Sequence, residues 1–121
     1  MKTREQRYAA GVLILIERVG EGEKTAYGSM AHQLPVLIRT AGLAQALAFV
    51  QSRRDTSQQR LLADLASVIG YATSEDLLKA SRDASLADYM RITQNALAAL
   101  LWFKRFAQSV LKVTADQRGD P

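Results

Sequence analysis

The 121-residue sequence contains no cysteine, one histidine and only two prolines. The absence of cysteine excludes disulfides, zinc–thiolate sites and cysteine nucleophiles. The scarcity of proline, together with abundant Ala, Leu, Gln and Arg, favours helix throughout the chain. The apolar runs are shorter than a membrane span, and the first residues are too charged for a secretory signal. We therefore expect a cytoplasmic protein that does not contact a membrane.

The residues that are present predict one domain with a basic surface. A chain of this length supports a single core, and a hydrophobic content of 48% argues against intrinsic disorder. Lysine and arginine number 16 against 12 acidic residues, which gives a net charge of +4, and arginine supplies 11 of the 16. This excess permits contact with phosphate or with an acidic partner, but a well-solvated surface explains it equally well.

Helical spacing of apolar residues and cap signals predict an all-α, single-domain helical bundle over residues 1–113, with a flexible tail at 114–121. The bundle should hold about five or six helices, of which the C-terminal one is long and apolar over most of its circumference, as a buried helix is. The expected starts and ends lie at Thr3 to about 19, 25–39, about 43–54, Asp55 or Thr56 to Gly70, Ser74 onward, and 85 to about 113. Pro35 should break or kink the second helix.

The search for reactive groups identifies no catalytic, metal or cofactor site. His32 has no cysteine or suitably spaced acid near it, so we interpret it as an ordinary surface or half-buried histidine. Glu75 and Asp76 are adjacent, point about 100° apart on a helix, and are better explained by the favourable charge of a helix start.

Two further motifs have structural explanations. The "GEGEK" stretch at residues 20–24 contains a G-x-G pattern, but Glu21 and Glu23 repel phosphate, so the stretch predicts a turn. The "VIGYATSEDLLKAS" stretch allows a helix-turn-helix, but its second helix begins with two acids, which argues against DNA reading.

Arginines on the predicted helices offer the more informative pattern. On a helical projection one strip contains Arg4, Arg7, Gly11 and Arg18, and a second contains Arg91, Asn95, Ala98, Trp102, Arg105 and Ser109. The small residues of the second strip suggest that a phosphate backbone or a partner could approach closely. Further cations, Arg39, Arg53 and Arg54, stand at the ends of the apolar stretch 39–54. Each group is also compatible with a merely solvated helix face.

Three stretches carry a resemblance to a known family. "YGSMAHQLPVLIRTAGLAQALAFVQSR" and "DYMRITQNALAALLWFKRFA", with the opening "REQRYA", resemble the small α-helical subunit of the Cmr complex. That complex is the type III-B CRISPR effector of bacteria and archaea. The resemblance extends to about residue 112, and "LPVLIRTAGLAQALAF" is its most distinctive block.

The resemblance implies a non-catalytic, all-α subunit of an antiviral ribonucleoprotein, without cofactor or metal. Several copies would stack along the filament of backbone subunits, contact neighbouring copies and the large subunit, and help enclose the guide RNA paired with its target RNA. RNA cleavage would belong to the backbone subunit. On this interpretation, RNA or partners are contacted by Arg91, Arg105, Arg39, Arg53 and Arg54, and by a second basic strip of Arg4, Arg7 and Arg18. The alternative is a free-standing helical module that binds nucleic acid or protein, while an enzyme would need a histidine or acidic cluster that the sequence lacks.

Overall fold

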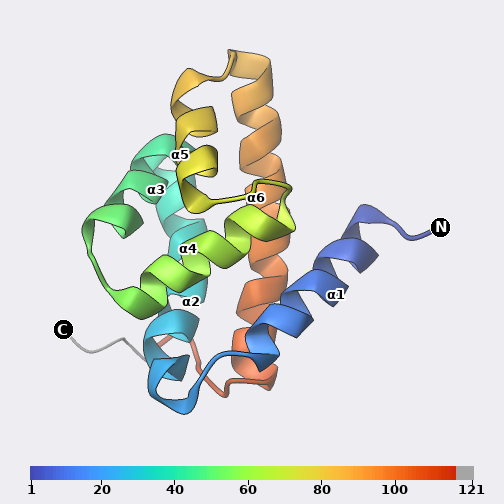
Figure 1. Cartoon of the computed structure of the whole chain (residues 1–121), viewed down its shortest axis with the longest axis vertical. Coiled ribbons are helices and arrows are strands. Elements are labelled where there is room, and N and C mark those ends of the chain that lie inside the picture. Colours follow the sequence, from blue (N-terminus) through green and yellow to red (C-terminus); the bar gives the residue numbers. More distant parts are fainter. Residues whose placement is uncertain (117–121) are drawn as a thin grey trace.

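Helices make up the fold in the computed structural model, which describes residues 1–116 (Figure 1). The elements are α1 (Arg4–Glu17), the 3-10 turn η1 (Glu21–Glu23), α2 (Lys24–Ala41), α3 (Leu43–Ser52), α4 (Thr56–Val68), α5 (Ser74–Asp83) and α6 (Leu86–Ser109). Residues 1–116 contain no strand. The predicted all-α class and the number of helices are therefore confirmed, and "GEGEK" is a turn as expected.

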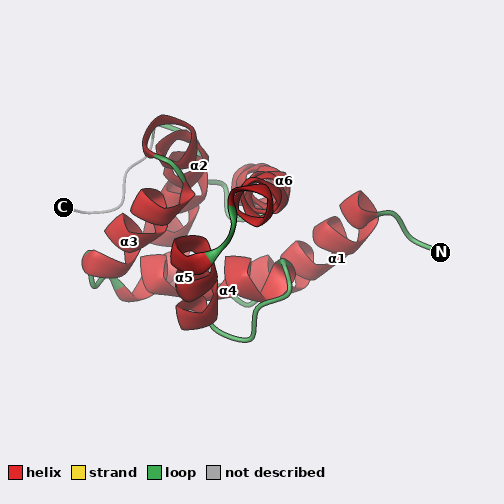
Figure 2. Ribbon diagram, turned by 90° about the horizontal axis from the view of Figure 1, so that it is seen from above, coloured by secondary structure: helices red, strands yellow, loops and turns green. Residues whose placement is uncertain are grey.

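The long helix α6 is the element around which the others are arranged. It packs against α1 and α2, and α4 touches α1, α2 and α6. Seen from above, α6 stands nearly end-on with α2 and α1 on different sides of it (Figure 2). The largest fully buried side chains come from every α-helix: Ile16, Tyr27, Met30, Leu34, Leu43, Leu47, Leu61, Leu62, Leu65, Leu77, Leu100 and Phe103.

Three helix starts are fixed by the caps that the sequence predicts. Thr3 Oγ1 accepts a hydrogen bond from the Gln6 backbone N–H, and the Gln6 side chain accepts one from the Thr3 N–H in return. Asp55 accepts from the backbone of residue 58 and thereby caps α4, while Ser85 accepts from the Asp88 N–H at the start of α6. Each cap satisfies backbone donors that the first helical turn leaves unpaired.

Pro35 neither ends nor divides α2, so the break that the sequence allowed there is absent. The helix runs unbroken from Lys24 to Ala41 with Pro35 inside it. An interior proline removes one backbone hydrogen bond and costs about 3 kcal/mol in an isolated helix. In this chain Pro35 is buried, as are Leu34 and Ile38 on the same helix. Tertiary packing therefore holds the helix together across a residue that would weaken it in isolation.

The last helix also ends earlier than expected. Helix α6 stops at Ser109 rather than near residue 113, and residues 110–113, the C-terminal strap, turn back onto the bundle. Lys112 has a left-handed backbone with φ of 62°, and the Val113 N–H donates to the Ala107 carbonyl at 2.9 Å. Leu111 and Val113 are buried. Of the expected tail at 114–121, residues 117–121 lie outside the described part of the chain.

His32 is buried, with 7% of its surface exposed, so the expectation of a surface or half-buried histidine was wrong. Its Nε2 lies 3.0 Å from the Val113 carbonyl oxygen, which can only accept, so Nε2 donates this bond. Nδ1 is buried without a hydrogen-bond partner among the described residues. The side chain thus fastens the strap to α2, a role that depends on a residue 81 positions away and that no local pattern reveals.

Candidate functional site

All eight arginines selected from the sequence are exposed. They are Arg4, Arg7, Arg18, Arg39, Arg53, Arg54, Arg91 and Arg105. Exposure leaves each of them accessible to a phosphate or a carboxylate of another molecule. The structure does not, however, arrange them in the two continuous strips that the helical projection suggested.

The strip on α6 is interrupted because α1 lies across its middle. Arg4 donates to the Asn95 side-chain oxygen at 3.1 Å, and the Trp102 indole N–H donates to Glu5 Oε2 at 3.1 Å. Trp102 also packs its ring against Phe106, with ring centroids 5.7 Å apart. The expected open path between Arg91 and Arg105 is therefore an internal contact between two helices, and Trp102 is no platform for a base.

The strip on α1 is divided as well. A Cβ built at Gly11 would lie 4.0 Å from Val68, so α4 approaches the middle of the strip. Arg4 and Arg7 remain at one end, where the Arg4 guanidinium lies 5.7 Å from the Tyr8 ring centroid. Arg18 remains at the other end of α1. The strip therefore consists of two separate basic ends.

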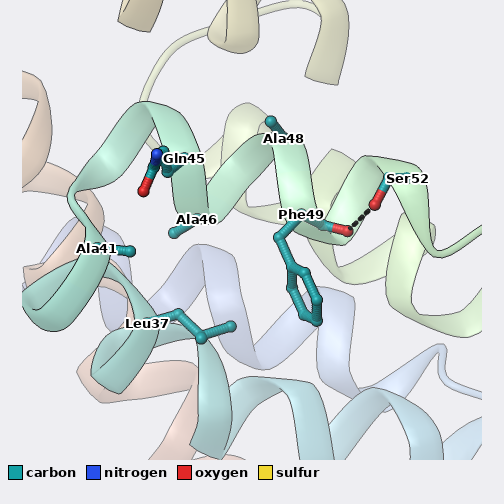
Figure 3. Close-up of a pocket in the computed structure, with 7 residues that line it drawn as sticks. All are labelled: Leu37, Ala41, Gln45, Ala46, Ala48, Phe49 and Ser52. Atoms are coloured by element: carbon teal, nitrogen blue, oxygen red, sulfur yellow. Dashed lines mark hydrogen bonds between the residues drawn. The ribbon is translucent and has the colours of Figure 1, made fainter.

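The arginines at the end of α3 stand beside an apolar groove. This α2–α3 groove is lined by Leu37, Ala41, Gln45, Ala46, Ala48, Phe49 and Ser52 (Figure 3). The Phe49 ring points into the groove, and the Arg53 guanidinium lies 5.5 Å from its centroid. Arg54 follows with a left-handed φ of 57°. Sequence reasoning missed the groove, because the exposure of Ala41, Ala48 and Phe49 is not visible in the sequence alone.

A partly buried polar network was also missed. The Tyr27 hydroxyl donates to Asp64 at 2.6 Å, and Arg60 donates to Glu23 at 2.8 Å and to the Arg18 carbonyl at 2.9 Å. Burial raises the pKa of Asp64 above its ordinary value, although the Tyr27 hydrogen bond and the positive charge of Arg60 oppose that rise. Burial, followed by the Asp64 charge, also raises the pKa of Tyr27. The network ties the end of α1 and the turn η1 to α2 and α4, which is a structural role.

Within residues 1–116 no three His, Asp or Glu side chains lie close enough to hold a metal ion. None of the helices in that range has the length and hydropathy that a bilayer crossing needs. The features that remain are exposed arginines and exposed apolar surface.

Comparison with known proteins identifies the family. Residues 4–110 match the model of the family described as CRISPR-associated protein (Cas_Cmr5). The CRISPR system Cmr subunit Cmr5 of Thermus thermophilus is 45% identical over 113 residues, which cover 93% of this chain and 99% of that protein. The chain belongs to the Cmr5 family.

A crystal structure from the Cmr5 family has the same fold. The X-ray structure of a CRISPR-associated Cmr5 family protein from Thermus thermophilus superposes with a TM-score of 0.85 at 46% identity. The superposition covers 90% of this chain and 98% of the other. The resemblance found in the sequence is therefore confirmed, and the family match includes every helix from α1 to α6.

Proposed function

We propose that this Cmr5-family chain is a non-catalytic structural subunit of a type III-B CRISPR (Cmr) ribonucleoprotein in the cytoplasm. In this proposal it stacks beside neighbouring copies along the filament of backbone subunits, contacts the large subunit, and helps hold the guide RNA on its target RNA. Family membership supports the assignment to a Cmr complex. The finer role, holding the RNA duplex, depends on the arginines.

The observation that carries the proposal is that most of the exposed arginines have no acidic partner. Of the eight, only Arg4 and Arg91 form ion pairs within residues 1–116, with Glu5 and Asp88, each at 3.4 Å. Exposed pairs of this kind contribute at most about 1 kcal/mol and are readily exchanged. Most of the arginine charge is therefore available to neutralise phosphates, and arginine binds phosphate in a bidentate manner.

Arg53 and Arg54 are the strongest candidates for RNA contact, with Arg39 as a third. All three are exposed and make no ion pair among the described residues. Because guide pairing selects the target sequence, these arginines should recognise RNA as a charged shape. Their removal should weaken binding equally for all sequences.

The test uses the complex purified from the native host. Each phosphate contact contributes about 0.7 to 0.9 to the slope of log affinity against log salt, so Arg53→Gln/Arg54→Gln should flatten that slope by about 1.4 to 1.8 per copy. The matched control, Arg53→Lys/Arg54→Lys, keeps the charge and should keep the slope. An unchanged slope in a complex with its full copy number would contradict the RNA role.

Co-purification distinguishes the alternative of a free-standing helical module. A tagged chain should elute from the native host with guide RNA and with larger Cmr proteins. Elution of the chain alone would refute assembly into a Cmr complex. In dilute solution the isolated chain should be a monomer or a weak oligomer, because a scaffold can hold weakly interacting neighbours at high effective concentration.

A further inference from the structure

One face of α6 carries an exposed apolar stripe. The α6 stripe consists of Leu86, Met90, Leu97 and Leu101. The exposed fractions of Leu86, Met90 and Leu101 are 76%, 54% and 44%, and Leu97 is half-buried. Their spacing places all four within about 60° around the helix, along roughly 22 Å of its length. This contradicts the expectation that α6 is buried around most of its circumference.

The described chain leaves Leu86, Met90 and Leu101 of the α6 stripe exposed, and Leu97 packs partly against the core. Helix α1 contacts α6 through Asn95 and Trp102, and the core contacts it through Ile92, Leu100 and Phe103. In Figure 2, the side of α6 that faces away from α4 has no helix over it. Scattered exposed leucines are ordinary, but an aligned apolar stripe, interrupted in α6 at Thr93 and Gln94, is a mark of an interaction site on a monomer.

Basic side chains lie along one flank and at the C-terminal end of the α6 stripe. Arg91 and Arg105 are exposed, and their positions lie about 40° to 80° beyond Leu101, on the side toward α1. Lys104 is exposed in line with the stripe, one turn beyond Leu101. The only acidic residue of α6, Asp88, lies outside the stripe and pairs with Arg91. An apolar centre with a charged rim is the usual anatomy of a protein interface.

We propose that the α6 stripe binds an amphipathic α-helix of another protein, with acidic residues on one flank of its apolar face. A single convex helix is matched by another helix packed along it, because side-chain ridges fit into grooves. The acidic flank would meet Arg91 and Arg105, with Lys104 at the end of the stripe. Charge complementarity at the rim thus selects the partner, and the apolar centre supplies most of the burial.

Two other occupants fit the face less well. A second copy would have to offer its own exposed apolar surface, and the α2–α3 groove is bordered by Arg53, so basic rims would meet and repel. RNA would gain from Arg91 and Arg105, but the leucines and the methionine of the α6 stripe offer it neither hydrogen bonds nor aromatic stacking.

Photo-crosslinking in the native host tests the proposal. A benzophenone amino acid is placed at Met90 or at Leu101, and at Ala63, an exposed position on α4, as the control. Both stripe positions should crosslink to one acidic amphipathic helix of another protein, and the control should not. Crosslinks to RNA or to a second copy of the chain, or no crosslink from either stripe position, would each overturn the proposal.

The crosslinked segment, made as a peptide, then gives the affinity. Met90→Glu/Leu101→Glu should weaken its binding to the full chain at least about tenfold, since charge enters the apolar centre. Arg105→Glu should weaken binding in low salt and less in high salt. Thr25→Glu/Ala63→Glu, which adds the same charge at exposed positions elsewhere, should leave it unchanged. Co-purification tests the Cmr assembly independently of this crosslink, so the two proposals can fail separately.

Discussion

Replacing Gly28 by alanine should destabilise the protein, although alanine is the better helix former. A Cβ at position 28 would lie 2.7 Å from Val113 Cβ and 2.9 Å from its Cγ1. Val113 Cβ is joined directly to the backbone, so the strap itself has to move. That movement exposes Val113, now 2% exposed, and stretches its carbonyl bond to His32.

The magnitude follows from the groups that move. Burial of a valine stabilises by about 1.5 to 3 kcal/mol, and the hydrogen bond by about 0.5 to 1.5 kcal/mol. Replacing glycine inside a helix returns about 1 kcal/mol. The free energy of unfolding should therefore fall by about 1 to 3.5 kcal/mol in Gly28→Ala, as measured by denaturant unfolding followed by circular dichroism.

A second background tests the reasoning behind this number. In Val113→Gly no side chain occupies the space beside position 28, so Gly28→Ala should there raise the free energy of unfolding by about 1 kcal/mol. The same substitution is expected to change sign between the two backgrounds, which is a direct coupling of neighbouring residues. An equal effect in both would show that the strap does not pack against Gly28.

Three further predictions concern stability and chemistry. Because burial raises the pKa of Asp64 above the ordinary 3.8, the folded state binds its proton more tightly than the unfolded state, and stability from this group is lost as pH rises from about 4 through the raised pKa. The unfolding free energy of Asp64→Asn minus that of the parent protein should accordingly rise over that pH range in denaturant titrations. A flat or falling value of this difference would contradict the direction of the shift. Asp55→Ala should cost about 1 kcal/mol in the same assay through loss of the α4 cap, whereas Thr56→Ala, at an exposed neighbouring position, should cost far less. The isolated chain should not cleave RNA with or without divalent metal, and cleavage abolished by a point substitution in this chain would refute the non-catalytic assignment.

Features set by neighbouring residues could be predicted from the sequence. The cap at Thr3 needs only Gln6, and the cap at Ser85 needs only Asp88, so both appear as short patterns. The all-α class follows from apolar spacing repeated along the chain. The unbroken helix at Pro35 could not be predicted, because it depends on burial of this residue against other elements.

The exposure of the candidate arginines was predictable, but their arrangement was not. A helical projection shows which residues share a side of a helix, and it placed Arg91 and Arg105 on one side correctly. It cannot show which other helix packs there. The contacts of Arg4 with Asn95 and of Glu5 with Trp102 join residues more than 90 positions apart, and no local pattern encodes them.

Those same two contacts determine what the surface of α6 can do. By lying across Asn95 and Trp102, α1 removes the small-residue path that a phosphate backbone would need. The α6 surface left open is the stripe through Met90 and Leu101, for which burial against an apolar partner is the favourable outcome. In the two proposals, Arg105, next to that stripe, meets an acidic protein partner, and phosphates are bound by arginines outside α6, first among them Arg53 and Arg54 just after α3.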